Sequence, residues 1–294
     1  MTGIRVPKGI GPGALLVRRA ACLRRGLTAA VLVALAPMGL WASACVPAQP
    51  SADGAAAQAA AAREPTTPRE VVEEMRLRWE SSWPRTLEAR LETTFYGRGA
   101  EQRQRWTQFY RVPGALRVEY EPRTAGNGLL YIDGQVHAFQ NGRATANARQ
   151  QDALLLAGFD LHVQPVDSSL IALAALGIDT SVVHRTAVDG VLSYVIGTAT
   201  PGDSAAPQLW VEADRWLARR VIESRAVGDG RILSEMRIVD RRLVDSIPLP
   251  AEVLRLRDGR PALREVWSEA RVGIPLDAAL FDPARWSAAV PPDA

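Results

Sequence analysis

Histidine and cysteine are the side chains best suited to metal binding or nucleophilic chemistry, and both are scarce in this chain. The histidines are His137, His162 and His184, and none has a second histidine or a cysteine at the short spacings typical of zinc ligands. No Gly-x-Ser-x-Gly nucleophile motif occurs, and residues 97–99 lack the third glycine of a dinucleotide-binding loop. We therefore predict that the protein has no metal and no cofactor.

Carboxylates are the remaining candidates for catalysis. Glu73 and Glu74 are adjacent, and adjacent positions on a helix do not face one another, so a solvated helix face explains this pair better than an acid–base site. Carboxylates scattered along the chain leave general acid–base catalysis open as an alternative. Because no arrangement of catalytic groups is recognisable, we predict that the protein is not an enzyme.

Cys45 ends a segment that has the three parts of a secretion signal. A basic region ends at Arg25, an apolar run covers residues 27–41, and the small residues 42–44 lead into the cysteine. The apolar run is shorter than the roughly 20 residues of a membrane-spanning helix. We interpret residues 1–44 as a signal peptide, with an uncleaved membrane anchor as the alternative.

The sequence around the expected cleavage point, Ala42-Ser43-Ala44-Cys45, resembles a bacterial lipobox, in which the cysteine is acylated and becomes the mature N-terminus. Alanine stands where leucine is usual, three residues before the cysteine. An ordinary signal-peptidase site, which would release a soluble chain, also fits these residues. We predict lipidation of Cys45 and a membrane anchor. The only other cysteine, Cys22, lies in the leader, so the mature chain has no internal disulfide.

The segment after the cysteine is rich in alanine and proline, and we predict a flexible tether over residues 45–66. Charge is unevenly distributed, because six of the 35 basic residues and none of the 32 acidic residues precede residue 45. The rest of the chain has 29 basic and 32 acidic residues, a net charge of −3, so we predict no nucleic-acid partner. A folded domain over 67–288 and a tail over 289–294 complete the expected organisation.

The folded domain is predicted to begin with a helix, because Thr67, Pro68 and Glu70 form the pattern of a capped helix N-terminus. Farther on, apolar and charged residues alternate in segments such as 87–95, which indicates antiparallel strands with one solvated face. Asp-Gly pairs, which favour type I′ hairpin turns, recur between strand-like runs at 133–134, 189–190, 229–230 and 258–259.

These patterns predict strands over 86–96, 103–112, 115–121, 128–133, 135–140, 191–198, 207–213, 217–227, 231–240, 251–257 and 262–272. Between them, residues 150–157 and 168–176 read as short helices. The second is apolar nearly all round, so we expect other elements to cover it on most sides. The predicted fold is a single α+β domain, in which a long curved antiparallel sheet forms a half-barrel and helices cover its concave face.

Two runs of residues carry a family resemblance. Residues 109–120 (FYRVPGALRVEY), followed by 130–139 (LYIDGQVHAF), resemble the bacterial lipoprotein-sorting carriers of the LolA/LolB-like family. Residues 209–212 and 281–283 are similar to that family's C-terminal half. The resemblance covers about residues 68–286, in order along the chain, without a strict motif.

This resemblance implies an open half-barrel whose apolar concave face holds an acyl chain of a lipid or lipoprotein beneath a helical cover. It also implies that Arg111 is a lid contact, because a strand arginine of that family bonds to the helices. Here Val112 separates Arg111 from Pro113, so an exposed strand arginine is the alternative.

Strand parity predicts which side chains line the concave face. Leu116, Val118 and Tyr120 share one face of their strand, and the opposite face of that strand carries charges. The predicted ligand cavity is lined by Leu91, Phe95, Trp106, Tyr110, Leu116, Val118 and Tyr120. A solid core filled by the helices is the alternative to an open cavity.

Together these features predict a monomeric lipoprotein of the bacterial cell envelope, on its periplasmic face. Val46 is not the aspartate typical of inner-membrane retention, which favours an outer-membrane anchor. The first functional hypothesis is a carrier or membrane-side acceptor that buries an acyl chain of a lipid or lipoprotein, at about 0.8 kcal/mol per CH₂. The second is an envelope sensor or scaffold that uses the same fold to bind a protein.

Overall fold

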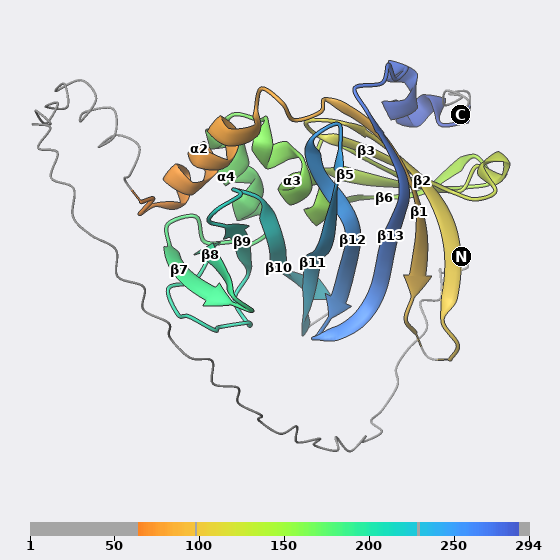
Figure 1. The fold of residues 1–294 in the computed structure, drawn as a ribbon. Helices are drawn as coiled ribbons and strands as arrows, with labels where there is room; N and C mark the ends of the chain where they lie inside the picture. The colour runs from red at the N-terminus through yellow and green to blue at the C-terminus, as the bar shows by residue number, and fades with distance from the viewer. Residues whose placement is uncertain (1–63, 98, 228–229, 288–294) are drawn as a thin grey trace, which may run out of the picture. The chain divides into compact units, whose positions relative to one another are not determined.

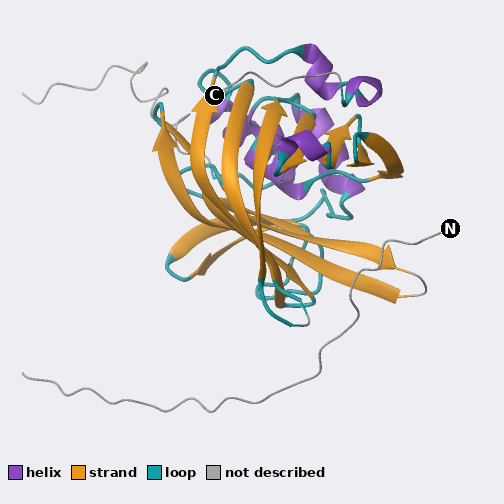
Figure 2. Ribbon diagram, turned by 90° about the vertical axis from the view of Figure 1, so that its right-hand side faces the viewer, coloured by secondary structure: helices purple, strands orange, loops and turns teal. Residues whose placement is uncertain are grey.

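The structure is a computed structural model that describes residues 64–97, 99–227 and 230–287 of the 294-residue chain. The described part contains one open antiparallel sheet of 13 strands and three α-helices. The sheet is curved, and the helices lie against its concave side (Figures 1 and 2). The predicted α+β half-barrel is therefore confirmed. Cys45, the predicted signal peptide 1–44, most of the tether and the tail lie outside the described residues.

Neighbouring strands of the sheet are also neighbours in the chain, except that β1 pairs with β13. The strands are β1 (Thr86–Phe95), β2 (Gln102–Arg111), β3 (Ala115–Tyr120), β4 (Gly128–Ile132), β5 (Gln135–Gln140), β6 (Arg143–Arg149), β7 (Val183–Val188), β8 (Val191–Ile196), β9 (Gln208–Glu212), β10 (Ala218–Val227), β11 (Gly230–Val244), β12 (Ile247–Arg257) and β13 (Arg260–Val272). The edge strands are β6 and β7, and the chain between them forms two of the helices.

The first described helix, α2 (Pro68–Trp79), begins as its sequence predicts. Thr67 Oγ1 accepts a hydrogen bond from the Glu70 amide at 3.2 Å, and the Glu70 carboxylate accepts one from the Thr67 amide at 3.0 Å. These bonds satisfy backbone donors that a helix N-terminus otherwise leaves without partners. Val72 and Met75, on the apolar stripe of the helix, are fully buried against the rest of the domain.

Helix α3 (Ala153–Gly158) lies inside the domain, and all six of its residues are buried. Asp152 caps it, because its carboxylate accepts hydrogen bonds from the amides of Leu154 and Leu155, both at 2.9 Å. Phe159 follows the helix and packs on the sheet, with its ring centroid 4.4 Å from that of Tyr110. This helix therefore fills the centre of the concave face.

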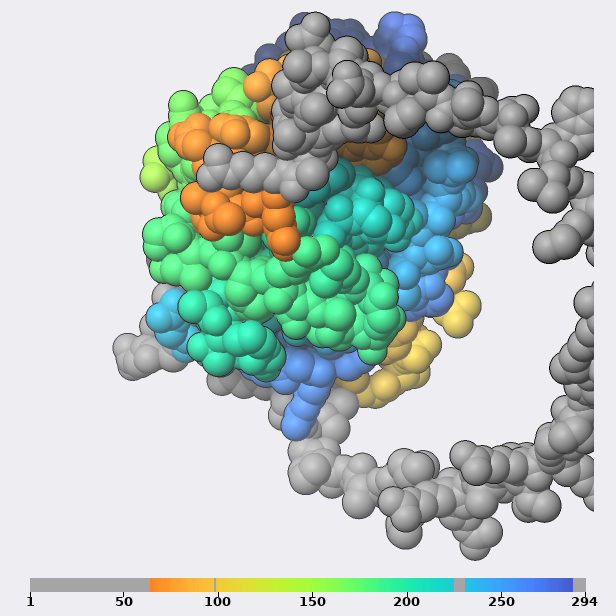
Figure 3. Space-filling view, turned by 60° about the vertical axis from the view of Figure 1, so that its left-hand side comes forward, coloured from red at the N-terminus to blue at the C-terminus, as the bar shows by residue number. Residues whose placement is uncertain are grey.

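Helix α4 (Val166–Ala175) is covered less than its composition suggested. Leu173 is fully buried, but Ile171 is 72% exposed. The helix packs against α2 on the concave side of the sheet, and half of its ten residues are exposed. Figure 3 shows α2, in orange, at the surface beside green segments that include α4. The expectation that other elements cover this helix on most sides is therefore wrong.

Three of the four predicted Asp-Gly turns adopt the expected backbone conformation. Both residues have positive φ in each turn, 51° and 70° at 133–134, 53° and 75° at 189–190, and 49° and 72° at 258–259. This is the signature of a type I′ turn, whose twist matches that of the strands it joins. Asp229, in the fourth pair, lies outside the described residues.

Two strands were not predicted from the sequence, and both are the edges of the sheet. All seven residues of β6 are exposed, and its alanines alternate with polar residues. A strand without a buried face lacks the apolar alternation by which strands are recognised. β7 is only partly buried, so its sequence also lacks a clear apolar alternation.

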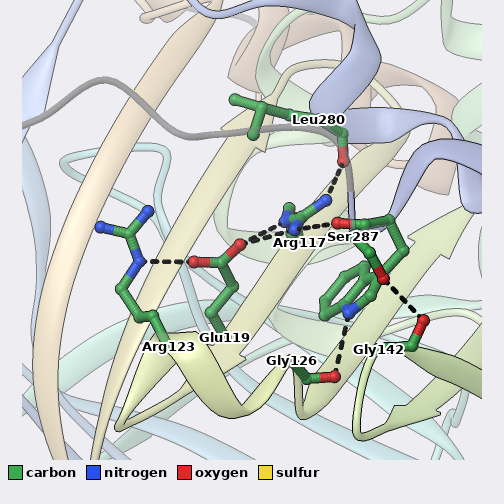
Figure 4. Close-up of polar contacts among 8 residues, drawn as sticks. Arg117, Glu119, Arg123, Gly126, Gly142, Leu280 and Ser287 are labelled. Carbon is green, nitrogen blue, oxygen red and sulfur yellow. Dashed lines mark hydrogen bonds and ion pairs between the residues drawn. The ribbon is translucent and has the colours of Figure 1, made fainter.

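The convex face of the sheet has a cover of its own at one end. Residues 278–287, here called the C-terminal strap, form two 3-10 turns that pack against β3–β5 with Leu280, Phe281 and Trp286. Beneath them Arg117 is only 2% exposed. Its guanidinium donates hydrogen bonds to the carbonyl oxygens of Leu280 and Trp286 at 3.0 and 2.9 Å (Figure 4).

The charge of Arg117 is balanced within the same buried group. Glu119 accepts from the Arg117 Nε and from the Arg123 Nε, each at 2.6 Å (Figure 4). The Trp286 ring also lies 3.8 Å from the Arg117 guanidinium. The face of β3 that the sequence marked as solvated is therefore buried here, since the strap carbonyls bind Arg117 and the two arginines bind Glu119.

Candidate functional site

Two rows of cross-strand neighbours run over the concave face from β1 to β6. In register order they are Ala89, Gln108, Val118, Leu129, Ala138 and Ala146, and then Leu87, Tyr110, Leu116, Tyr131, Val136 and Ala148. The members on β1–β3 are buried, those on β4 and β5 are half-buried, and the two on β6 are exposed. The helices therefore cover the middle of the concave face and leave its β4–β6 end open.

The structure brings the seven predicted lining residues together on this face. Those buried in the main apolar cluster are Leu91, Trp106, Tyr110, Leu116 and Val118. The other two, Phe95 and Tyr120, pack half-buried against the same cluster. Trp106 joins them, with its ring centroid 5.8 Å from Phe95 and 5.1 Å from Tyr120. Their contact with a ligand stays a prediction.

An open hollow of about 300 Å³ begins where this aromatic group ends. It lies between the start of α3 and strands β1 and β10–β13, and we call it the mouth hollow. Its apolar lining includes Phe95, Val221, Met236, Leu256 and Leu263, and its polar lining includes Gln150, Glu223, Ser234, Glu235, Arg255 and Arg257. A neighbouring hollow of about 430 Å³ shares Gln150 and Glu223 with it and reaches Ala175 of α4. Of the seven predicted lining residues, only Phe95 touches the mouth hollow.

A polar network connects the wall of the mouth hollow to the helical cover. Arg255 Nη2 lies 3.1 Å from Asp152 Oδ2, and its Nε lies 3.6 Å from Glu265 Oε2. Gln108 Nε2 donates to Glu265 Oε1 at 3.4 Å, and the Tyr110 hydroxyl donates to Gln108 Oε1 at 2.6 Å. Because Asp152 is also the N-cap of α3, Arg255 ties this helix to the sheet.

The network perturbs the ionisation of its members. Burial raises the pKa of Glu265, although the guanidinium of Arg255 opposes that rise. Burial also lowers the pKa of Arg255, but attraction to Asp152 and Glu265 outweighs this effect and raises it overall. The guanidinium therefore stays charged and holds two carboxylates that would otherwise lie uncompensated.

Two further titratable groups lie beneath the helices, between α3 and α4. Burial raises the pKa of Asp160 to about 7, against the effect of the hydrogen bond its carboxylate accepts from the Gly114 amide. Burial lowers the pKa of His162 to about 3, and Arg241 lowers it further. Both ring nitrogens of His162 lack a hydrogen-bond partner, and its ring centroid lies 4.0 Å from that of Trp83.

Arg111 lies on the other face of the sheet. It alternates with Tyr110 along β2, and its guanidinium lies 4.9 Å from the ring of Phe281 in the C-terminal strap. The arginine that reaches the helical cover is Arg255 instead, on β12. This role could not be predicted from the sequence. Residues 254–257 alternate leucine with arginine, a pattern that favours leucines facing the core and arginines facing solvent.

The described residues contain no cluster of three or more histidine, cysteine, aspartate or glutamate side chains that could hold a metal ion. Within the same ranges, no helix is both long and apolar enough to cross a membrane. The candidate site consists of the mouth hollow, the polar network on its wall and the open end of the concave face.

No family model and no curated protein sequence matches the chain. Among solved structures it is similar to a DUF1329 family protein from Desulfovibrio piger, with 14% identity over 73% of this chain and 95% of that chain, at a TM-score of 0.48. It is also similar to a LolA superfamily protein from Nitrosomonas europaea, with 12% identity over 74% and 98% of the two chains and a TM-score of 0.47.

A third similar structure is a domain of a candidate outer membrane lipoprotein-sorting protein from Vibrio parahaemolyticus. Its identity is 11%, over 74% of this chain and 97% of that chain, and its TM-score is 0.49. At such identities a likeness concerns the fold and does not extend to what is bound.

Proposed function

We propose that this protein is an envelope lipoprotein that binds an acyl chain of a lipid or lipoprotein in the mouth hollow, as a carrier or membrane-side acceptor. In this proposal Cys45 is acylated and holds the domain on the periplasmic face of the outer membrane. The observation that carries the proposal is an open hollow, lined in part by apolar side chains, on the concave side of the half-barrel.

The position of the mouth hollow supports this use. Phe95 and Leu263 are cross-strand neighbours on this face, and Met236 lies beyond Arg255 in the same row, so the wall has two apolar parts with the Arg255 side chain between them. Each CH₂ that moves from water onto such a wall contributes about 0.8 kcal/mol, so a long acyl chain can bind without metal or cofactor. The aromatic group of Phe95, Trp106 and Tyr120 extends this wall towards β3.

Much of the concave face is filled by the protein itself, and this observation favours a second candidate function. Phe159 and the residues of α3 occupy the space over Tyr110 and Leu116 that a deep cavity would need. In this second candidate function the domain is a scaffold or sensor, and the open β4–β6 end of its concave face binds another protein. Acyl binding and protein binding are separated by the following test.

Filling the mouth hollow should abolish acyl binding without unfolding the domain. In Leu263→Trp the larger ring occupies space beside Phe95, and we expect the affinity of the full chain for a fluorescent fatty acid to fall at least tenfold. The matched control is Leu254→Trp, a half-buried leucine on the opposite face of the neighbouring strand, which should bind like the wild type. Fluorescence titration and thermal unfolding of all three proteins provide the measurement.

Two outcomes would reject the acyl-binding function in favour of the scaffold. One is a wild-type chain that does not bind the fatty acid at any tested concentration. The other is Leu263→Trp binding with wild-type affinity while its melting temperature is unchanged. Binding that fails only in Leu263→Trp supports the proposal.

A further inference from the structure

Strand β6 (Arg143–Arg149) is an edge of the sheet and pairs with β5 alone. All seven of its residues are exposed, whereas only half of the residues of β7, the opposite edge, are exposed. An edge strand presents a row of backbone amide and carbonyl groups that another strand can bind. β6 is therefore the edge of the described sheet that a further strand can reach most easily.

The register of the sheet shows which backbone groups of β6 point outward. The Gln150 amide donates to the Gly134 carbonyl at 3.0 Å, and the pairing of β5 with β6 continues this register. In an antiparallel ladder, residue pairs that exchange hydrogen bonds alternate with pairs that do not. The amide and carbonyl of Ala148 therefore face β5, whereas those of Asn147 and Arg149 face away from the sheet.

Strands β4–β6 carry positive charge and no negative charge. They include Arg143 and Arg149 and contain no aspartate or glutamate. In the described part of the chain, neither arginine has a hydrogen-bond or ion-pair partner. The carboxylates of Asp133 and Glu223 line a hollow together with Arg149, whereas Arg143 lies at the other end of the strand. The less compensated of the two charges on this edge is therefore that of Arg143.

A strand added next to β6 would also extend the concave face. The rows that cross β4 and β5 on this face end on β6 at Ala146 and Ala148, which are small and exposed. Ala138 and Val136, the members of these rows on β5, are half-buried. Because side chains alternate along a strand, every second side chain of an added strand would lie beside the two alanines. Apolar side chains fit these positions.

We infer that β6 is a docking edge for an extended segment of another protein, with apolar side chains towards the concave face and an acidic residue where it meets Arg143. In this mode of recognition, backbone hydrogen bonds to groups such as those of Asn147 and Arg149 supply affinity, and alternate side chains supply specificity. The inference goes beyond acyl binding and does not depend on it.

A second copy of the chain fits this edge less well than an acidic segment does. In the antiparallel register that pairs all seven residues of β6 with those of a copy, Arg143 of each strand lies opposite Arg149 of the other. Like charges placed directly opposite one another destabilise a strand pair, whereas opposite charges stabilise it. The two arginines therefore disfavour self-pairing and favour an acidic partner.

The test measures binding of a fluorescently labelled heptapeptide, Thr-Val-Thr-Val-Thr-Glu-Glu with blocked termini, to the full chain. Its glutamates are C-terminal because all strand pairs of the described sheet are antiparallel, so this end would meet the start of β6. One control peptide has lysine in place of glutamate, and another is N-methylated at alternate amides. Fluorescence anisotropy should show the acidic peptide binding about tenfold more tightly than either control.

Asn147→Pro should weaken peptide binding about tenfold, because it removes an outward amide at an edge position that tolerates proline. The matched control is Ala187→Pro, which places proline at an exposed position of β7 and should bind like the wild type. Arg143→Gln should reduce the preference for the acidic peptide over the lysine peptide. Arg149→Gln should reduce it less, since two carboxylates share its hollow. Thermal unfolding checks that each variant is folded.

The inference is overturned if the wild type shows no saturable binding of the acidic peptide, or if it binds the N-methylated peptide equally well. It is also overturned if folded Asn147→Pro or Arg143→Gln binds like the wild type. Self-association of the wild type that Asn147→Pro abolishes would name a second copy as the occupant instead. Leu263→Trp should bind the peptide normally, so failure of this inference and failure of acyl binding are distinguishable.

Discussion

Arg255 is a half-buried charge that connects the helical cover of the half-barrel to its sheet. Its guanidinium lies between Asp152, which caps α3, and Glu265, which belongs to the central strands. Removing water from ionised groups is costly, and the cost is offset only while every member keeps its partner. The same side chain forms part of the wall of the mouth hollow, so the stability of the helical cover and the shape of the candidate site are linked.

Replacing Arg255 with methionine should be strongly destabilising. Arg255→Met leaves two buried carboxylates without a counter-charge, and we expect a loss of about 3–5 kcal/mol in the free energy of unfolding. Arg264→Met is the matched control, because Arg264 and Glu252 form a partly exposed ion pair on the opposite face of the same strands, worth at most about 1 kcal/mol. Urea titrations of both variants provide the comparison. Equal losses would show that Arg255 does not hold the cover.

Asp160 and His162 should give opposing contributions to the pH dependence of stability. The folded protein raises the pKa of Asp160 from 3.8 to about 7, so it binds more protons than the unfolded chain between these values and loses stability as pH rises. It lowers the pKa of His162 from 6.5 to about 3, so the unfolded chain binds more protons there and stability is lost as pH falls. Between about pH 4 and 6.5 the slopes oppose each other, at up to about 1.4 kcal/mol per pH unit each.

Single substitutions should separate the two slopes. In Asp160→Asn, which keeps an acceptor for the Gly114 amide, the free energy of unfolding relative to wild type should rise as pH increases from 4 to 7. In His162→Leu the free energy of unfolding relative to wild type should fall as pH increases from 4 to 6.5. Chemical denaturation at each pH measures both differences. Parallel pH profiles for the two variants and the wild type would contradict the assigned ionisation states.

Two of the predicted lining residues should respond differently to the same new charge. Val118 is 3% exposed in the filled part of the core, so Val118→Glu should cost at least about 3 kcal/mol. Phe95 lines the mouth hollow, where a carboxylate can reach water, so Phe95→Glu should leave the domain folded. Thermal unfolding of both variants is the measurement. If both unfold alike, the hollow is not open at Phe95.

At the scale of elements, the sheet is covered on both sides by segments from opposite parts of the chain. Helices α2–α4 lie on the concave face, and the C-terminal strap lies on the convex face (Figures 1 and 4). The strap is short and contributes few apolar residues, chiefly Leu280, Phe281 and Trp286. Polar contacts add to this packing: Arg117 donates two hydrogen bonds to the strap backbone, Trp286 Nε1 donates to the Gly126 carbonyl at 3.1 Å, and Ser287 Oγ donates to the Gly142 carbonyl at 2.7 Å.

Removing those two bonds should release the strap and leave the helical cover in place. In Arg117→Met we expect hydrogen exchange of residues 278–287 to increase at least tenfold, with little change in α2–α4. Arg105→Met is the control, because Arg105 is highly exposed in its ion pair with Glu121 on the same convex face. Exchange measured by mass spectrometry tests both. Unchanged protection of 278–287 in Arg117→Met would show that apolar packing alone holds the strap.

At the scale of the whole molecule, the pairing of β1 with β13 joins the two ends of the folded domain in one sheet. The N-terminal strands carry the aromatic group and the C-terminal strands carry Arg255 and Arg257, so the mouth hollow exists only when both halves are in register. The described domain starts about 20 residues after Cys45. A chain of that length can hold a folded domain on a membrane while leaving it free to turn.

Lipidation is tested on the full chain. We expect Cys45→Ala to move the protein from the membrane fraction to the soluble envelope fraction, because the acyl group is its proposed anchor. The N-terminal peptide of the wild type should carry the mass of attached lipid. A wild-type protein that is already soluble, with an unmodified N-terminus, would show that residues 42–45 form an ordinary cleavage site.

The sequence alone determined most of the local structure. Capping at Thr67, the type I′ turns at 133–134, 189–190 and 258–259, and the strands with one apolar face all follow from rules acting over a few residues. The half-barrel class followed from these elements and from the family resemblance. Edge strands β6 and β7 were missed because a strand without a buried face leaves little local signal.

Only the tertiary structure decided which charged residues are buried and which covers lie on which face. Arg117 and Arg255 each alternate with apolar residues, yet the C-terminal strap buries Arg117, and Arg255 is half-buried in an ion pair with the N-cap of α3. Some of their partners, the strap carbonyls for Arg117 and Asp152 for Arg255, lie more than 100 residues away in the chain, and the period of a strand contains no information about them. The mouth hollow therefore belongs to the assembled sheet and to no segment of it.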